Sequence, residues 1–220
     1  MSERPTTNDP PAVIFDYAGV LSLHQPAADW QRLESLAGVV GEAFYDAYWG
    51  HREPYDQGRL ETSAYWRRVA SQLGVTFGAE RIATLTEIDT ASWVHMNDTM
   101  VAWLESLQAA GVRTAILSNM GVDLRRHVAE AFPWVARCDH RTFSCDVGAA
   151  KPEPAIYHHC LRGLGVDAAD AVFIDDRPPN LEASEALGLR GILFDEVEAF
   201  AARLEGLGLP PLPVLVGAQR

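Results

Sequence analysis

Four short runs of apolar residues, rich in β-branched side chains, mark out the chain. They occupy residues 12–15, 114–117, 171–174 and 191–194, and the first three end abruptly at polar side chains. The runs are continuously apolar instead of alternating with polar residues. Each is therefore expected to form a strand that is buried on both faces, as in a parallel sheet.

Amphipathic helical patterns separate the later strands. Apolar residues recur at helical spacing over residues 101–110, 156–164 and 181–187, and a glycine follows each pattern, as is common at helix C-termini. Alternating strands and helices with right-handed crossovers predict a doubly wound α/β fold with a parallel sheet. Ligands of such folds bind beyond the carboxyl ends of the strands, where the polar residues fall.

The segment between the first two predicted strands breaks this alternation. It carries helical stripes at residues 30–40 and 65–73 and no clear strand pattern. We therefore predict that residues 26–95 form an inserted α-helical cap that covers the active site. The α/β core would then comprise residues 1–25 and 96–220.

Composition and charge narrow the possible functions. The 220 residues are 48% hydrophobic and 22% charged, and Asp and Glu (30) exceed Lys and Arg (18), for a net charge of −12. Such a surface repels phosphate backbones and anionic lipids, so we expect no nucleic acid or membrane partner. No apolar run approaches the ~20 residues that span a bilayer.

Three cysteines without CxxC spacing favour a reducing compartment. We expect a cytoplasmic protein, either a monomer or a homodimer.

Polar side chains of complementary chemistry are expected to meet at the carboxyl edge of the sheet. In chain order they are Asp16, Ser118, Asn119, Lys151, Asp175 and Asp176. Lys151 is the sole lysine, since the other 17 basic residues are arginines. Clustered carboxylates do not all ionise readily unless a cation joins them, and oxygen ligands favour Mg²⁺, which often bridges to a substrate phosphate. A carboxylate, a lysine and Mg²⁺ together would suit phosphoryl transfer.

Four motifs resemble, in the same order, those of the haloacid dehalogenase-like (HAD) superfamily. They lie at residues 15–21, 117–119, 151–157 and 173–176, and Asn180 follows the last one. The resemblance covers about residues 12–200, and the helical insertion resembles the cap that this superfamily places after the first motif. The layout looks most like small cytoplasmic sugar-phosphate phosphatases and the phosphatase domain of soluble epoxide hydrolases.

The resemblance implies a catalytic role for each matching residue. Asp16 would attack phosphorus and form an aspartyl-phosphate. Lys151 would hold both the nucleophile and the phosphate, while Ser118 and Asn119 would bind the phosphoryl oxygens. The implied substrate is a small phosphorylated metabolite, and Arg52 in the cap is a candidate residue for binding it.

The resemblance also implies a set of ligands for Mg²⁺. Asp16 and Asp176 would coordinate the ion directly, and Asp175 through water. The backbone carbonyl of Ala18 would be a further ligand, a role that needs no particular side chain.

The side chain at position 18 departs from the family pattern. Phosphatases of this superfamily usually carry aspartate there as general acid and base, and losing such a group typically costs ~10²–10⁴ in rate. The methyl group of Ala18 can act neither as a general acid nor as a general base. The enzyme could act on esters whose leaving group needs little protonation, or borrow an acid from substrate, water, the cap or His24. Alternatively, the protein is a catalytically weakened HAD protein that binds a phosphorylated ligand or a protein partner.

Two other HAD chemistries can be compared with the sequence. Phosphonoacetaldehyde hydrolases carry alanine at this position but need a cap lysine, which residues 26–95 lack. The 2-haloacid dehalogenases use no metal, whereas the doubled carboxylate of Asp175 and Asp176 argues for Mg²⁺. We therefore expect a Mg²⁺-dependent hydrolase that acts as a phosphatase, with dehalogenation as a minor alternative.

Overall fold

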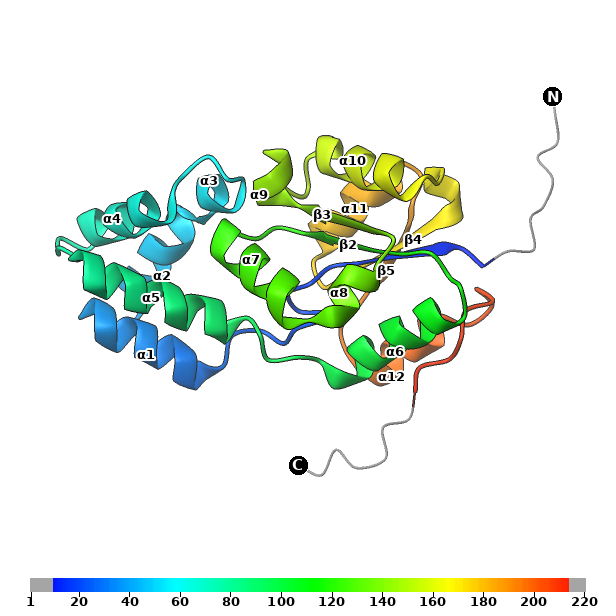
Figure 1. Cartoon of the computed structure of the whole chain (residues 1–220), viewed down its shortest axis with the longest axis horizontal. Helices are drawn as coiled ribbons and strands as arrows, with labels where there is room; N and C mark the ends of the chain where they lie inside the picture. Colours follow the sequence, from blue (N-terminus) through cyan, green and yellow to red (C-terminus); the bar gives the residue numbers. More distant parts are fainter. Residues whose placement is uncertain (1–9, 214–220) are drawn as a thin grey trace.

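A parallel five-stranded sheet forms the centre of the molecule in the computed structural model, which describes residues 10–213 (Figure 1). The strands are β1 (Ala12–Phe15), β2 (Thr114–Ser118), β3 (His140–Phe143), β4 (Ala171–Asp175) and β5 (Arg190–Leu193). Their spatial order is β3-β2-β1-β4-β5, and every neighbouring pair is parallel. The predicted doubly wound α/β fold is confirmed.

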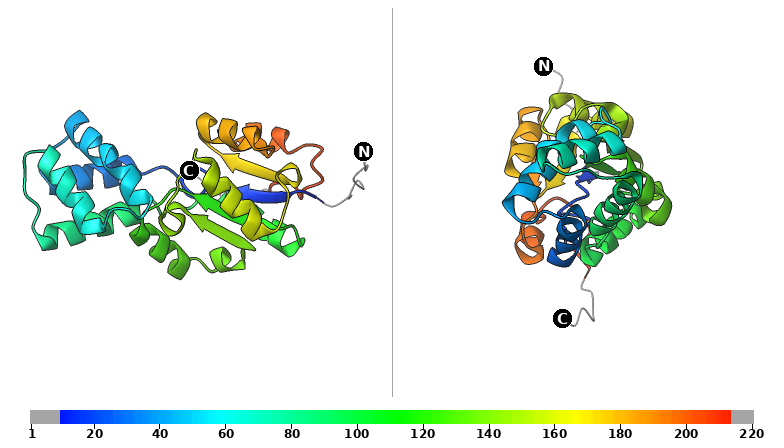
Figure 2. Two further views of the ribbon diagram at one scale, coloured as in Figure 1. Left: turned by 90° about the horizontal axis from the view of Figure 1, so that it is seen from above. Right: turned by 90° about the vertical axis from the view of Figure 1, so that its left-hand side faces the viewer.

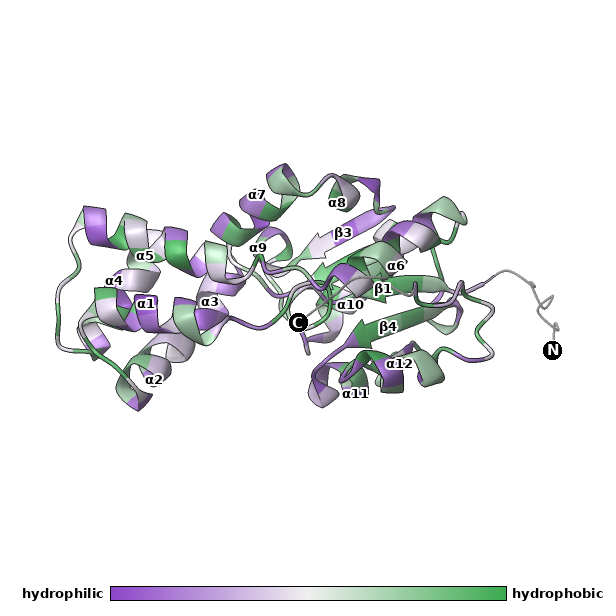
Figure 3. Cartoon of the chain, turned by 90° about the horizontal axis from the view of Figure 1, so that it is seen from below, coloured by the Kyte–Doolittle hydropathy of each residue, from purple (hydrophilic) through white to green (hydrophobic). Residues whose placement is uncertain are grey.

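Four of these strands overlap the predicted apolar runs, and β3 was not predicted. Every residue of β1, β2 and β4 is buried. In contrast, β3 lies at the edge of the sheet and begins with half-buried His140 and exposed Arg141, which makes it partly hydrophilic in Figure 3. An edge strand tolerates polar residues because solvent reaches it, so no apolar run marks it in the sequence.

Helices pack on both faces of the sheet. Those of the α/β part are α6 (Asp98–Ala109), α7 (Val122–Ala131), α8 (Pro133–Arg137), α9 (Ser144–Val147), α10 (Pro154–Leu164), α11 (Pro178–Ala186) and α12 (Val197–Arg203). On one face, Phe15 packs in a cluster with Trp103 of α6 and Phe200 of α12. On the other face, Ile14 packs with Ile156 of α10. Neighbouring residues of β1 thus pack against helices on opposite faces of the sheet. The helices of both layers are labelled in Figure 1. Within residues 10–213, no helix combines the length and apolarity needed to cross a membrane.

Five helices lie between β1 and α6, and they form what we call the helical insertion. They are α1 (Ala27–Ala37), α2 (Glu42–Gly50), α3 (Arg52–Asp56), α4 (Thr62–Gln72) and α5 (Ala79–Ser92). The helical insertion occupies one end of the long axis of the molecule (Figure 2). It has its own apolar cluster, which includes Phe44, Tyr48 and Trp66. The division of the chain into domains at residues 26 and 95 stays a prediction.

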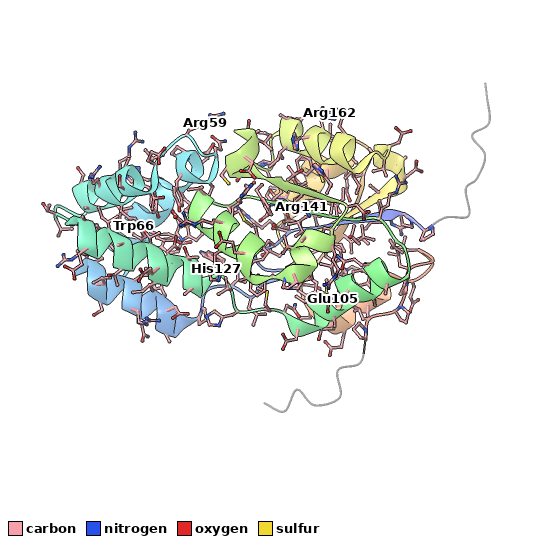
Figure 4. All side chains as sticks on the ribbon, in the orientation of Figure 1. Arg59, Trp66, Glu105, His127, Arg141 and Arg162 are labelled. Carbon is pink, nitrogen blue, oxygen red and sulfur yellow. The ribbon has the colours of Figure 1, made fainter. Side chains whose placement is uncertain are left out.

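The loop after α3 fastens the helical insertion to the α/β part. Gln57 donates a hydrogen bond from Nε2 to Oε1 of Glu153 at 2.7 Å. Arg59, labelled in Figure 4 at this junction, donates from Nη2 to the carbonyl of Gly148 at 2.7 Å. Both acceptors lie near the third motif, so these bonds hold the helical insertion close to Lys151.

Candidate active site

A buried ion pair joins Asp16 to Lys151 at the carboxyl edge of the sheet. Asp16 follows β1 directly and is 5% exposed, and Lys151 is 6% exposed. The Nζ atom of Lys151 lies 2.8 Å from Oδ1 of Asp16 and 2.7 Å from Oδ2 of Asp175. The backbone N–H of Tyr17 donates to Oδ1 of Asp16 at 2.6 Å. The lysine thus bridges carboxylates from two neighbouring strands.

Burial and mutual charge set the protonation of this group. Burial raises the pKa of Asp16 to about 7, Lys151 opposes that rise, and Asp175 adds to it. Burial also raises the pKa of Asp176, and the charge of Asp175 raises it further. Burial alone would lower the pKa of Lys151, but the two carboxylates that it contacts raise it above its ordinary value. A further cation at the carboxylates would favour their ionised form.

Three carboxylates converge closely enough to share a metal ion. Asp16, Asp175 and Asp176 each place an oxygen within 4.8 Å of the others. The side chain of Asp176 is 16% exposed and lies 3.2 Å from Nε2 of His24. An all-oxygen set of this kind, open to water on one side, fits Mg²⁺, which usually retains several waters.

The carboxylate of Asp175 is already occupied by hydrogen bonds. It accepts bonds from Nζ of Lys151, from Nδ2 of Asn180 at 3.0 and 3.1 Å, and from the backbone N–H of Arg177 at 2.8 Å. Asp175 is fully buried. These contacts suit a residue that orients Lys151 and contacts a metal through water, whereas Asp176 is freer to coordinate directly.

The two residues that follow the apolar run of β2 have different surroundings. Ser118 is 1% exposed, and its Oγ has no hydrogen-bond partner within residues 10–213. A buried hydroxyl without a partner costs free energy, although Ser118 itself does not line the cavity beside Asp16. Asn119 donates from Nδ2 to the carbonyl of Lys151 at 2.9 Å and accepts from the N–H of Lys151 at 2.8 Å. Asn119 therefore positions the lysine segment, and the phosphate contacts of both residues stay predictions.

A cavity of about 580 Å³ opens at this edge of the sheet. The α/β part contributes Asp16, Ala18, Lys151 and Asp176 to its wall, and the helical insertion contributes Tyr45, Trp49, Arg52, Glu53 and Asp56. The structure therefore brings the predicted nucleophile, lysine and metal ligand together in one cavity. The sequence had not indicated Tyr45, although its spacing of four residues from Trp49 on α2 places both on one helix face.

Arg52 lies in the cavity wall but is held by a buried network. Its Nε donates to Asp56 at 3.0 Å, and its Nη1 donates to Asp89 at 2.9 Å and to Oη of Tyr48 at 2.7 Å. Arg52 is 6% exposed. Two acidic residues thus compensate its charge, which gives it a structural role that the sequence did not predict. Its contact with substrate stays a prediction.

Replacement of Arg52 by alanine should lower the free energy of unfolding by about 3–5 kcal/mol, because the buried carboxylate of Asp89 and the half-buried carboxylate of Asp56 would lose their cation. Urea unfolding measures this effect. The matched control is Arg32→Ala, since Arg32 pairs with Asp29 at the surface and should contribute less than about 1 kcal/mol. Unchanged stability of the Arg52 variant with a raised KM alone would mean that Arg52 serves the substrate instead.

The comparison with known proteins identifies the family. Residues 10–188 match the family model for haloacid dehalogenase-like hydrolases, and the chain belongs to this family. Its fold is similar to that of a HAD family enzyme from Bacteroides thetaiotaomicron, solved as a magnesium complex, with a TM-score of 0.74. The identity is 17%, over 89% of this chain and 98% of that one.

Two curated relatives also match most of the chain. Sesquiterpene phosphatase astK of Aspergillus oryzae is 26% identical over 89% of this chain and 95% of its own length. Bifunctional epoxide hydrolase 2 of Mus musculus is 26% identical over 91% of this chain and 40% of its own length. The chain therefore spans less than half of that second protein. The predicted resemblance to HAD hydrolases is confirmed.

Proposed function

We propose that the protein is a Mg²⁺-dependent phosphatase of small phosphorylated metabolites. The observation that carries this proposal is the buried contact of 2.8 Å between Asp16 and Lys151, within a carboxylate cluster that opens into the cavity. Support comes from a relative named as a phosphatase and from the magnesium complex of a protein with a similar fold. A cytoplasmic location and a monomeric or homodimeric state are further parts of the proposal.

The proposed reaction has two steps at Asp16. First, its carboxylate attacks phosphorus, the bond between phosphorus and the ester oxygen breaks, and the aspartyl-phosphate forms. The ester oxygen leaves as an alkoxide and takes its proton from solvent water. Water then attacks phosphorus, which releases phosphate and restores the carboxylate. Lys151 and the hydroxyl of Ser118 stabilise negative charge on the phosphoryl oxygens. Mg²⁺, when held by Asp16 and Asp176, supplies further positive charge for these oxygens.

A second candidate function rests on Ala18. This half-buried residue lines the cavity, and its methyl group can neither protonate the leaving alcohol nor activate water. A protein with this site could bind a phosphorylated ligand without turning it over. Release of alcohol from esters with poor leaving groups separates the two functions.

The test of the proposed function is phosphate release from an ester panel that includes p-nitrophenyl phosphate, with Mg²⁺ or with EDTA. We expect release that requires Mg²⁺ and that disappears in Asp16→Asn. Equal release by the wild type and Asp16→Asn would refute the phosphatase. Chloride release from a 2-haloacid that persists in EDTA would support the dehalogenase alternative.

Gly19 provides a test of the role of Asp176 in metal binding. Its φ is +82°, and a Cβ atom there would lie 2.5 Å from Oδ2 of Asp176. Gly19→Ala should therefore displace the carboxylate and raise the Mg²⁺ concentration needed for half-maximal activity about 10–100-fold. The matched control is Gly38→Ala, because Gly38 has a similar φ of +78° with nothing near its Cβ position. An equal Mg²⁺ requirement in both variants would argue against the proposed ligand.

A further inference from the structure

An aromatic surface extends from the catalytic cluster along one side of the cavity. Tyr45 and Trp49 line the cavity from α2, although they are 53% and 38% exposed. The ring of Trp49 lies 6.3 Å from that of Tyr45 and 6.4 Å from that of Trp93, measured between centroids. Trp93 and Leu124 also line the cavity. Exposed apolar side chains that gather at a cavity usually mark a binding surface.

The charges on the same side of the cavity disfavour a substrate body that carries further negative charge. Within residues 10–213, Arg52 is the one basic side chain that the helical insertion contributes to the cavity wall. Asp56 and Asp89 already compensate its charge. Glu53 also lies in the wall and adds negative charge. A second phosphate or a carboxylate on the substrate would find no unpaired cation from the helical insertion here.

The end of the cavity that the α/β part forms is polar and carries basic side chains. Lys151 lies there between two carboxylates, and Arg177, which directly follows Asp176, also lines the wall. The cavity is thus polar where the phosphate would react and aromatic beyond that point. At about 580 Å³, its volume is in the range of clefts that enclose small organic ligands.

We propose that the substrate is a phosphate monoester of an apolar alcohol, with a hydrocarbon or aromatic body and a single phosphate. This inference rests on the proposed function, and it departs from the sugar phosphates that the sequence resemblance suggests. The phosphate lies at Asp16 and Lys151, and the apolar body packs against Tyr45, Trp49 and Trp93. Burial of each added methylene favours binding by about threefold to fourfold.

The test is a series of primary alkyl phosphates from ethyl to octyl, assayed with Mg²⁺ beside glucose 6-phosphate. The leaving groups of the alkyl series have nearly equal basicity, so kcat/KM reports how well the body binds. We expect kcat/KM to rise about threefold to fourfold per methylene until the cavity is filled. Glucose 6-phosphate should fall well below octyl phosphate.

Variants of Trp49 connect this dependence to the aromatic surface. Trp49→Ala should lower kcat/KM for octyl phosphate about 10–100-fold, with less than about a twofold change for ethyl phosphate, and Trp49→Phe should restore most of the loss. The control is Val40→Ala, which removes an exposed apolar side chain (69% exposed) that lies in the connection between α1 and α2 and is absent from the cavity wall.

The possible outcomes separate this inference from the proposed function. If phosphate release depends on Asp16 but kcat/KM does not depend on alkyl length, the inference fails and the proposed function stands. The same holds if Trp49→Ala lowers kcat/KM equally for ethyl and octyl phosphate. If no ester in the series or the panel gives release that depends on Asp16, both the proposed function and the inference fail.

Discussion

Replacement of Ala18 by aspartate is expected to raise turnover of alkyl phosphates about 10²–10⁴-fold, the usual contribution of a general acid–base group. Ala18 lines the same cavity as Asp16 and Asp176, so a carboxyl group at this position would face the reacting phosphate. Its proton would serve the departing alkoxide, and the resulting carboxylate would then activate water. Steady-state release of phosphate from hexyl phosphate measures the gain.

The leaving group and a matched variant test the origin of this gain. The p-nitrophenolate anion leaves without a proton, so p-nitrophenyl phosphate should show a much smaller increase in the first step. Ala18→Asn has the size of aspartate but cannot transfer a proton at neutral pH, and it should show no gain. An equal gain in Ala18→Asn, or none in Ala18→Asp, would mean that the missing acid and base do not limit this enzyme.

Replacement of Lys151 by methionine is expected to lower kcat/KM by at least about 10³-fold, because the buried cation beside Asp16 and the phosphate is lost. The structure adds an effect on stability. Asp16 and Asp175 would remain buried without their shared cation, which should lower the free energy of unfolding by about 3–5 kcal/mol. Paired assays of activity and urea unfolding measure both effects.

The pH dependence of the Lys151→Met variant provides a second readout. Burial already raises the pKa of Asp16 to about 7, and loss of the lysine would raise it further. A carboxyl whose pKa is higher in the folded protein than in the unfolded chain destabilises the fold as the pH rises. The loss of stability should therefore be greater at pH 8 than at pH 5. The control, Lys151→Arg, keeps the charge and should lose less stability, and equal losses in both variants would contradict this account.

The sheet was predictable because burial on both faces leaves a continuous apolar pattern. β1, β2 and β4 carry that pattern, and the polar residues at their ends converge as expected. Strand β3 was not predicted because its position at the edge of the sheet permits the polar residues His140 and Arg141, which interrupt the apolar pattern. Helix α5 was also missed, since its buried residues, such as Ile82 and Leu85, are interspersed with threonine and alanine and form no clear stripe.

The internal bonds of the site were less predictable than its members. The motifs predicted that Asp16, Lys151 and Asp176 lie close together. No local pattern shows that the amide of Asn119 forms hydrogen bonds with the backbone of Lys151, 32 residues away. Likewise, the sequence did not reveal the contact of Arg52 with Asp89, because Asp89 is 37 residues further along the chain. Such pairings depend on tertiary packing, which single-sequence periodicity does not reveal.

The most direct test of the account is the intact mass of the protein after it is mixed with p-nitrophenyl phosphate and Mg²⁺ and quenched in acid. Since Ala18 cannot activate water, we expect the aspartyl-phosphate to accumulate. The wild type should gain the mass of one phosphoryl group, mapped to the peptide with Asp16, and Asp16→Asn should gain none. A phosphoryl group on another residue, or phosphate release by Asp16→Asn at the wild-type rate, would contradict the central role of Asp16.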